Sequence, residues 1–279
     1  MIVKDLLTNE EKENIEIELL LQVIYSVSGF DFQKYMRSSI KRRIINRMRQ
    51  EKMEKISSLV EKVLYEKGFV EKLIDDFSIH VTEMFRDPEF FKAFRLKVVP
   101  LLKEIPTIRI WHAGCSTGEE VFSMAILLKE EGIYDRAKIY ATDINERVLL
   151  QAKEGILPLN QMQSYTKNYL AAGGKQEFSE YYSTDYQNAY LDAALLKNIV
   201  FFQHNLVTDG SFNEFHIIIC RNVMIYFTGE LQNSVHQLFY DSLCHNGLIG
   251  IGSKETLRSS VFSRKYKEIV SQQNIYQKI

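Results

Sequence analysis

The sequence has few of the residues that mark secreted, disulfide-bonded or membrane proteins. Its 279 residues include three cysteines, four prolines and one tryptophan. An odd number of cysteines gives no paired framework, which favours a reducing, cytoplasmic setting. No stretch approaches ~20 continuous apolar residues, so no membrane-spanning helix is expected. The start, MIVKDLLTNEEKEN, lacks the apolar run of a signal peptide. We therefore expect a soluble intracellular protein without membrane insertion.

The chain also lacks an excess of either charge. Lys and Arg number 35 against 36 Asp and Glu, a net charge of -1, so no overall basicity points to nucleic acid. The six histidines show neither an H-E-x-x-H pattern nor C-x-x-C neighbours, and no metal site is expected. What is present is ordinary for a globular protein: 46% hydrophobic and 25% charged residues, enough for a large core.

Residues 1–78 read as a small all-helical domain. Apolar residues recur at helical spacing in one segment: Ile17, Leu20, Leu21 and Ile24. A second helix is predicted over residues 31–52, with an apolar side formed by Ile40, Ile44, Ile45 and Met48. Further helical pattern follows over residues 56–77.

The second helix carries an unusual number of basic residues, among them Arg42, Arg43, Arg47 and Arg49. A charge run of this kind is usually a solvated helix face. The alternative is a surface that binds an acidic partner, because only acidic residues such as Glu51 could partly offset it.

Residues 108–279 alternate short apolar runs with helical patterns, after a linker over residues 79–107. Strands are predicted at IRIWHAG, KIYATDI, IVFFQHNL, FHIIICRNVMIY and LIGIGS, with two more near the C-terminus. Apolar strands that alternate with helices predict a mostly parallel sheet covered on both faces. Residues 177–201, rich in Tyr and turn residues, interrupt this rhythm and are expected to form a small antiparallel insert.

A glycine loop is the strongest local signal. The strand IRIWHA runs into Gly114-Cys115-Ser116-Thr117-Gly118, and a helix is predicted from Glu119. Glycines there allow a sharp turn and close approach of a ligand to the backbone. Two glutamates at the helix start repel a phosphate and suit a cationic ligand. They could equally do no more than complement the helix dipole.

Asp143 ends the next predicted strand, one βα unit after the glycine loop. An acidic residue at this place can accept hydrogen bonds from ribose hydroxyls. An isolated Asp there could equally cap the following helix. Together with the glycine loop, Asp143 favours a nucleoside with a cationic centre, such as S-adenosylmethionine (SAM).

Five segments in this order resemble the CheR chemoreceptor methyltransferases: HVTEMFRDPEFF, AGCSTGEE, ATDI, HNL and CRNVMIYF. The resemblance runs from about residue 15 to the C-terminus. It implies a helical N-terminal domain and a Rossmann-like SAM-dependent methyltransferase domain with a small β-subdomain. It also implies transfer of a methyl group from SAM to receptor glutamates, with S-adenosylhomocysteine as the second product.

The matching positions imply a SAM-binding set of His80, Thr82, Arg86, Gly114, Glu120, Asp143, Asn205, Leu206, Arg221 and Asn222. Tyr226 matches a tyrosine close to the transferred methyl group, and we expect it to hold the acceptor carboxylate together with Arg86. We place Tyr226 at the end of a strand, and Thr82 and Arg86 one helical turn apart. The chain departs from the family at His80, where Asn is usual, and at Met84, Val121 and Phe122.

The acceptor needs little chemical help, because a glutamate carboxylate has an ordinary pKa of about 4.3 and is already an anion at neutral pH. The resemblance implies chemoreceptor cytoplasmic domains as partners, contacted by the basic helix and the β-subdomain. We expect a monomer in the cytoplasm, at receptor clusters. Two alternatives stay open: a methyltransferase for a small molecule or nucleic acid, and a non-catalytic binding scaffold.

Overall fold

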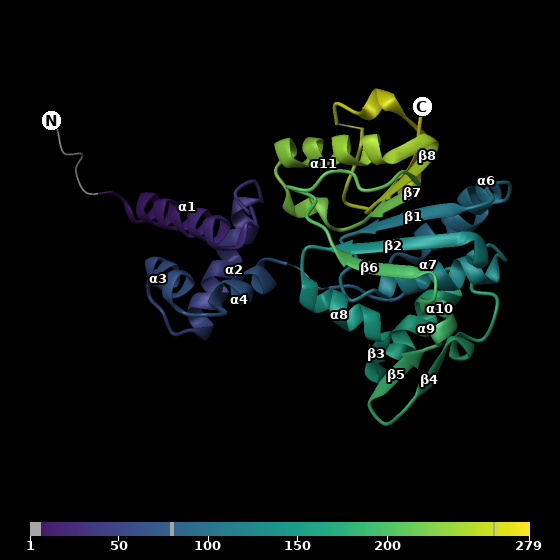
Figure 1. The fold of residues 1–279 in the computed structure, drawn as a ribbon, viewed down its shortest axis with the longest axis horizontal. Coiled ribbons are helices and arrows are strands. Elements are labelled where there is room, and N and C mark those ends of the chain that lie inside the picture. The colour runs from purple at the N-terminus through teal and green to yellow at the C-terminus, as the bar shows by residue number, and fades with distance from the viewer. Residues whose placement is uncertain (1–6, 79–80, 259) are drawn as a thin grey trace. The chain divides into compact units, whose positions relative to one another are not determined.

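The computed structural model describes residues 7–78, 81–258 and 260–279. The chain forms two compact units (Figure 1). The helical unit spans Met1–Ile79 and also includes Tyr226–Gln232. The sheet unit spans His80–Ile225 and Asn233–Ile279. The segment Tyr226–Gln232 therefore belongs to the helical unit, although it lies about 150 residues further along the chain than the rest of that unit.

The helical unit is built from α1 (Asn9–Ser28), α2 (Arg37–Gln50), α3 (Ser57–Tyr65) and α4 (Phe69–Phe77). α1 begins with a capping box: the Thr8 hydroxyl accepts from the Glu11 amide at 3.2 Å, and the Glu11 carboxylate accepts from the Thr8 amide at 2.8 Å. The buried residues of α1 are Ile17, Leu20, Leu21 and Ile24, as the apolar spacing predicts.

α2 is shorter than predicted, because residues 31–36 are not helical. The Asp31 carboxylate accepts a hydrogen bond from the Gln33 amide at 2.8 Å, which favours a turn over a helix. Tyr35 then forms an antiparallel bridge with Phe227, and the Met36 amide donates to the Tyr226 carbonyl at 2.7 Å. These contacts keep the segment extended and attach Tyr226–Gln232 to the helical unit.

The sheet unit holds one large, mostly parallel sheet in the order β6-β2-β1-β7-β8-β10-β9. Its strands are β1 (Ile108–Ala113), β2 (Ala137–Asp143), β6 (Ile199–Gln203), β7 (Phe215–Cys220), β8 (Leu243–Ile251), β9 (Tyr266–Val270) and β10 (Ile275–Lys278). The pairs from β6 to β8 are parallel, whereas β10 pairs antiparallel with both neighbours. The chain reverses its direction of winding between β1 and β7, the place where open α/β sheets bind ligands.

Helices cover both faces of this sheet, as predicted (Figure 1). Ile110, Ile139 and Ile217 join the core beneath α7 (Glu119–Glu130). On the other face Trp111 packs against Phe239 of α11 (Gly229–Ser242), with ring centroids 5.4 Å apart. The remaining helices are α5 (Pro88–Ala93), α6 (Val99–Leu102), α8 (Glu146–Glu154), α9 (Met162–Ala171) and α10 (Ala193–Leu196), with a π-helical turn at Phe94–Val98 between α5 and α6.

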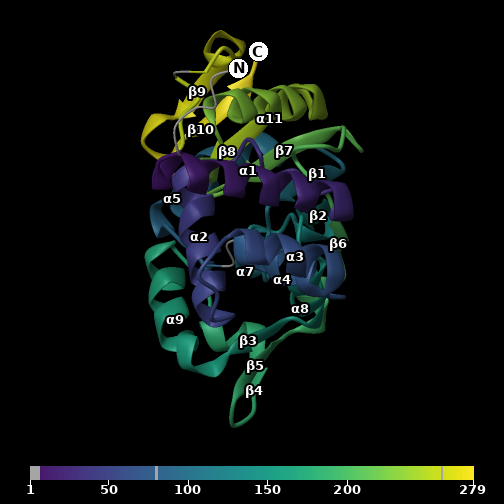
Figure 2. The same cartoon turned by 90° about the vertical axis from the view of Figure 1, so that its left-hand side faces the viewer.

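A small antiparallel sheet, in the order β3-β5-β4, forms the predicted insert but with different boundaries (Figure 2). Its strands are β3 (Ile156–Pro158), β4 (Tyr182–Thr184) and β5 (Asn188–Leu191). The range 177–201 therefore omits β3 and wrongly includes the start of β6, which pairs with β2 in the large sheet. The pairing of β3 with β5 joins residues 30 to 34 positions apart in the chain, which a local sequence pattern cannot reveal.

β7 ends at Cys220, six residues before the predicted end. Asn222 takes a left-handed backbone conformation with φ of 61°, which a continuing strand does not permit. A short 3-10 turn at Met224–Tyr226 follows. The prediction that Tyr226 ends the strand is therefore wrong.

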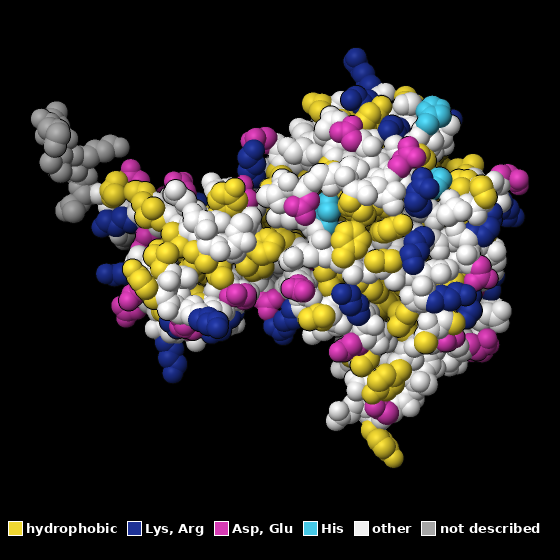
Figure 3. All heavy atoms as spheres, viewed as in Figure 1, with side chains coloured by type: hydrophobic (Ala, Val, Ile, Leu, Met, Phe, Trp, Pro, Cys, Tyr) yellow, Lys and Arg dark blue, Asp and Glu magenta, His cyan; other side chains and the backbone are white. Residues whose placement is uncertain are grey.

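Among the described residues, no helix is long and apolar enough to cross a membrane. The face of the sheet unit seen in Figure 3 carries Lys and Arg as well as Asp and Glu side chains.

Candidate active site

The glycine loop turns sharply between β1 and α7. Gly114 and Gly118 have positive φ angles of 79° and 95°. A Cβ atom on Gly118 would lie 2.7 Å from the Phe122 ring, and one on Gly114 would collide with the Val223 side chain. Both positions therefore require glycine, for conformation as well as for space.

Asp143 ties this loop to the end of β2. Its Oδ2 atom accepts from the Ser116 amide at 2.9 Å, and its Oδ1 atom accepts from the Asn145 amide at 3.0 Å. The cap of α8 is Asn145, whose side chain accepts from the Arg147 amide. Of the two interpretations of Asp143, the helix cap is thus wrong, and a buried carboxylate stands at the carboxyl end of the sheet.

The two glutamates that open α7 have different surroundings. Glu119 is buried and accepts from the Thr117 hydroxyl at 2.6 Å, and burial raises its pKa. Burial also raises the pKa of Glu120, but the Arg221 guanidinium and His112 outweigh it and hold this pKa below its ordinary value. The negative charge of Glu120 is therefore compensated by Arg221 and His112, whereas Glu119 has no basic partner among the described residues.

Arg221 follows β7 directly and connects three segments. Its Nη1 atom donates to Glu120 at 2.7 Å, and its Nη2 atom donates to Asp87 at 2.7 Å. The guanidinium also lies over the Phe90 ring, 4.2 Å from the centroid. Arg221 thus holds the linker against the carboxyl edge of the sheet.

Asn205 and Leu206 follow β6 beside the end of β2, where the His204 amide donates to the Asp143 carbonyl at 3.1 Å. The Asn205 side chain is buried and accepts from the Val207 amide at 2.9 Å. The ends of β1, β2, β6 and β7 therefore bring together Gly114, Glu120, Asp143, Asn205, Leu206, Arg221 and Asn222.

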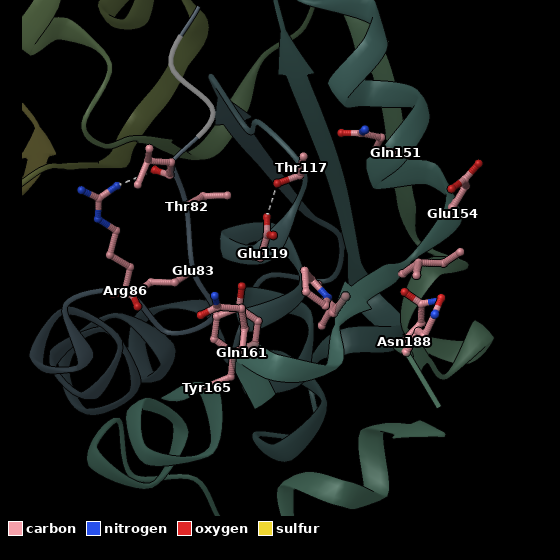
Figure 4. A pocket seen from close by; sticks show the side chains of 15 residues that line it. Thr82, Glu83, Arg86, Thr117, Glu119, Gln151, Glu154, Gln161, Tyr165 and Asn188 are labelled. Carbon is pink, nitrogen blue, oxygen red and sulfur yellow. Dashed lines mark hydrogen bonds between the residues drawn. The ribbon is translucent and has the colours of Figure 1, made fainter. Parts of the chain in front are cut away.

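A cavity of about 820 Å³ opens beside the glycine loop (Figure 4). Thr82, Glu83 and Arg86 of the linker line one side. Thr117 and Glu119 lie between them and residues of α8 and the small sheet, among them Gln151, Glu154 and Asn188. Thr82 and Arg86 are thus the predicted site residues that line this cavity.

The helical-turn argument for Thr82 and Arg86 is wrong, because the described residues 81–87 are not helical and α5 begins at Pro88. The two side chains share the cavity because the linker is anchored elsewhere. The Phe85 amide donates to the Ser123 hydroxyl of α7 at 2.8 Å. Met84, Val121 and Phe122, three of the positions where the chain departs from the family, are fully buried in the core, so their side chains act in packing.

Two further predicted positions, His80 and Tyr226, stay predictions. His80 lies outside the described residues. Tyr226 belongs to the helical unit, where the Arg43 guanidinium lies 5.6 Å from its ring centroid.

The basic helix is only partly available to a partner, which corrects the prediction for two of its arginines. Arg43 is buried and donates to the Asp76 carbonyl at 2.5 Å. Arg47 pairs with the Asp76 carboxylate at 2.6 Å and with Glu51 at 3.4 Å. Arg42 and Arg49 are exposed and have no hydrogen-bond or ion-pair partner among the residues that the structure describes.

Sequence reasoning missed two residues of the site. His112 is buried in β1, and its Nδ1 atom lies 3.2 Å from Glu120. Glu255 is buried behind the loop that follows β7, where it accepts from backbone amides. A histidine within the apolar run IRIWHA could have indicated a buried polar group near the site. The segment GSKETL, by contrast, has no pattern that indicates burial of its glutamate, Glu255.

Comparisons with known proteins match both parts of the chain. The family description "CheR methyltransferase, SAM binding domain" matches residues 80–274, and "CheR methyltransferase, all-alpha domain" matches residues 15–78. A "Putative methyltransferase Cher3" of Pseudomonas putida is 47% identical over 272 residues, covering 98% of this chain and 100% of the relative. A "Chemotaxis protein methyltransferase" of Borreliella burgdorferi is 29% identical, over 91% of this chain and 94% of the relative. A protein of the same description from Listeria monocytogenes is 28% identical, over 82% of this chain and 85% of the relative.

Proposed function

Because the chain belongs to the CheR methyltransferase family, and is thus a SAM-dependent methyltransferase, we propose that it methylates glutamate side chains of chemoreceptor cytoplasmic helices. The products are glutamate methyl esters and S-adenosylhomocysteine. The observation that carries the proposal is the likeness, over 82% to 91% of the chain, to proteins described as chemotaxis methyltransferases. The site supports it through the glycine loop, which follows β1 at the switch point of the sheet, and through Asp143, which ends β2 and accepts from the Ser116 amide of that loop.

The residues at this edge fit SAM. The buried Ser116 hydroxyl has no hydrogen-bond partner among the described residues and can meet a polar ligand atom. Glu83, Glu119 and Glu154 line the adjoining cavity, which favours a ligand with a positive centre. Asp143 has the acceptor chemistry that a pair of ribose hydroxyls needs. We propose that SAM is held by Thr82, Arg86, Gly114, Glu120, Asp143, Asn205, Leu206, Arg221 and Asn222.

Bound SAM supplies a methyl group that is electrophilic because it is attached to a sulfonium. The protein then needs no general base, since the acceptor carboxylate is ionised at neutral pH. Its residues have to strip water from the carboxylate and aim one oxygen at the methyl carbon, which can lower a barrier by several kcal/mol.

Arg86 is our candidate for holding the acceptor carboxylate. Its Nη1 atom donates to the Val81 carbonyl at 2.9 Å, and its other N–H groups have no partner among the described residues. A half-buried guanidinium with free donors suits a carboxylate. Tyr226 remains a second candidate from the family resemblance alone.

Two surfaces are proposed to contact the receptor. Arg42 and Arg49 offer unpaired positive charge on α2 to an acidic helix surface. Tyr186, at the turn between β4 and β5, is fully exposed and offers an aromatic anchor.

Two measurements test the proposal. Calorimetry measures SAM affinity, which a non-catalytic scaffold need not have. Transfer of a radiolabelled methyl group to a receptor-containing membrane fraction, followed by mild base, then reports the bond formed. Base-labile label supports a carboxyl ester, whereas base-stable label shows methylation at nitrogen or on a ring and overturns the proposed acceptor.

A further inference from the structure

Glu255 is a buried carboxylate with an unusual set of partners. It lies four residues after β8, is 8% exposed, and forms no ion pair among the described residues. Its two oxygens instead accept from four backbone amides: Gly252 at 2.6 Å, Asn222 at 3.1 Å, Val223 at 3.1 Å and Ile225 at 3.2 Å. Hydrogen bonds to an ionised acceptor are the stronger kind, so this carboxylate can hold a loop in place.

The loop that Glu255 contacts runs from the end of β7 into the 3-10 turn at Met224–Tyr226. β7 ends at Cys220, so residues 222–225 have no place in a strand ladder. Asn222 has φ of 61°, a left-handed conformation that ends the strand and that Asn adopts more readily than most other residues. Buried amides need acceptors, and the amides of Asn222, Val223 and Ile225 all donate to the Glu255 carboxylate. The loop is therefore organised around Glu255.

The position of Glu255 is itself fixed from the other side. The Asn274 side chain, between β9 and β10, donates to the Gly252 carbonyl at 3.0 Å and to the Glu255 carbonyl at 2.9 Å. Gly252 permits the close approach, because a Cβ atom there would lie 2.6 Å from the Glu255 Oε2 atom and 2.8 Å from the Asn222 nitrogen. Asn274 thus holds the turn Gly252–Glu255 in place, and Glu255 in turn holds the loop of residues 222–225.

We infer that Glu255 is a positioning residue for SAM binding, because it fixes the loop that carries Asn222 and follows Arg221. This inference rests on the proposed role of these two residues in holding SAM. Glu255 itself acts on the backbone of the loop and not on the ligand.

The test compares two glutamine variants in the full chain. Glu255→Gln keeps the size of the side chain but turns an N–H group toward amides that need an acceptor. Glu130→Gln is the control: outside the loop, the buried Glu130 carboxylate accepts from the Tyr169 and Tyr181 hydroxyls and the Lys175 amide, and it also pairs with Arg95 at 2.6 Å. Melting temperature, SAM affinity and hydrogen exchange are measured for both.

In Glu255→Gln we expect faster exchange at the amides of Asn222, Val223, Ile225 and Gly252, and SAM affinity lower by about tenfold, the effect of weakening one charged hydrogen bond. In Glu130→Gln we expect wild-type SAM affinity at a comparable loss of melting temperature. Equal SAM affinity in wild type and Glu255→Gln overturns the inference, and so does an equal loss in both variants.

The inference and the proposed function fail in different ways. A wild-type chain that does not bind SAM contradicts the proposed function, while unchanged amide exchange in Glu255→Gln contradicts the support of the loop. If Glu255→Gln does not fold, Gly252→Ala provides the same test, because its methyl group pushes the carboxylate away from the Asn222 amide. Wild-type exchange and affinity in Gly252→Ala also overturn the inference.

Discussion

At the scale of single residues, Asp143 connects the glycine loop to the next strand, and it also has the chemistry to bind a ribose. Replacing it tests the second role. Asp143→Ala should lower SAM affinity by roughly ten- to a hundredfold, since hydrogen bonds to a charged group contribute about 1.5–3 kcal/mol. Calorimetry measures this loss. Asp143→Asn keeps one acceptor oxygen, so its SAM affinity should lie between those of wild type and Asp143→Ala. If Asp143→Ala binds SAM as tightly as wild type, the ribose assignment is wrong.

The four arginines of α2 separate into two pairs with different expected effects. The double variant Arg42→Glu, Arg49→Glu should weaken receptor methylation and leave SAM affinity unchanged, because both side chains are exposed. Wild-type methylation should also weaken with salt, which screens exposed charges beyond ~8 Å at physiological ionic strength. Arg47→Ala should instead lower the melting temperature, because Arg47 pairs with Asp76 inside the helical unit.

Lys67→Glu, an exposed charge reversal outside α2, is the control for the double variant. Methylation that is insensitive to salt and to the double reversal would rule out the α2 surface as a receptor contact.

The arginines also show what sequence can and cannot predict at this scale. The apolar spacing correctly predicted which residues of α1 are buried. It could not show that the Arg43 and Arg47 side chains are hydrogen-bonded inside the helical unit, because their common partner, Asp76, lies about 30 residues further along the chain. The Glu255 carboxylate was missed for the same reason, since its acceptor role depends on amides 30 to 33 residues away.

At the scale of elements, the β4–β5 hairpin is a rigid turn that presents one aromatic side chain. The Asp185 carboxylate accepts from the Gln187 amide at 2.8 Å, the Asn188 amide at 2.7 Å and the Tyr190 hydroxyl at 2.6 Å. Tyr186 is fully exposed between them. The turn is thus fixed without help from the Tyr186 side chain.

Tyr186→Ser should therefore leave folding and SAM affinity unchanged and lower the rate of receptor methylation several-fold, because aromatic anchors dominate interfaces. The control is Tyr65→Ser, which removes another exposed aromatic side chain, 84% exposed, from the helical unit. Steady-state rates at subsaturating receptor measure the difference. Equal rates for both variants would exclude the hairpin tip as a receptor contact.

The elements themselves were largely predictable, and the errors have local physical causes. Apolar runs located β1 and β2 to within one residue, because parallel strands buried on both faces leave a continuous signal. The run IVFFQHNL extends three residues past the end of β6, and LIGIGS misses the first five residues of β8. The predicted strand continued past the end of β7 because Val223, Met224, Ile225 and Tyr226 extend the apolar run, while the left-handed Asn222 stops the strand. β3 was missed because three residues carry too little pattern.

At the scale of the whole molecule, one buried histidine makes stability depend on pH. His236 in α11 is 3% exposed, and burial lowers the pKa of its imidazole to about 4. The unfolded chain has a histidine pKa of about 6.5. As the pH falls through this interval the unfolded state binds the proton and the folded state does not, so the free energy of unfolding decreases, by about 3 kcal/mol at most for this group.

Thermal unfolding between pH 7 and pH 4 measures this slope. His236→Gln should flatten it, whereas His245→Gln, at an exposed position, should leave it unchanged. Parallel pH profiles for wild type and His236→Gln would show that this histidine does not set the acid sensitivity.

The central claim is that the whole chain transfers a methyl group from SAM to receptor glutamates. The most direct measurement incubates the purified protein with SAM carrying a deuterated methyl group and a purified chemoreceptor cytoplasmic fragment, then locates the label by tandem mass spectrometry. The account predicts label on glutamate side chains, lost in mild base and absent when those glutamates are replaced by alanine. Base-stable label on lysine, arginine or the N-terminus would contradict it.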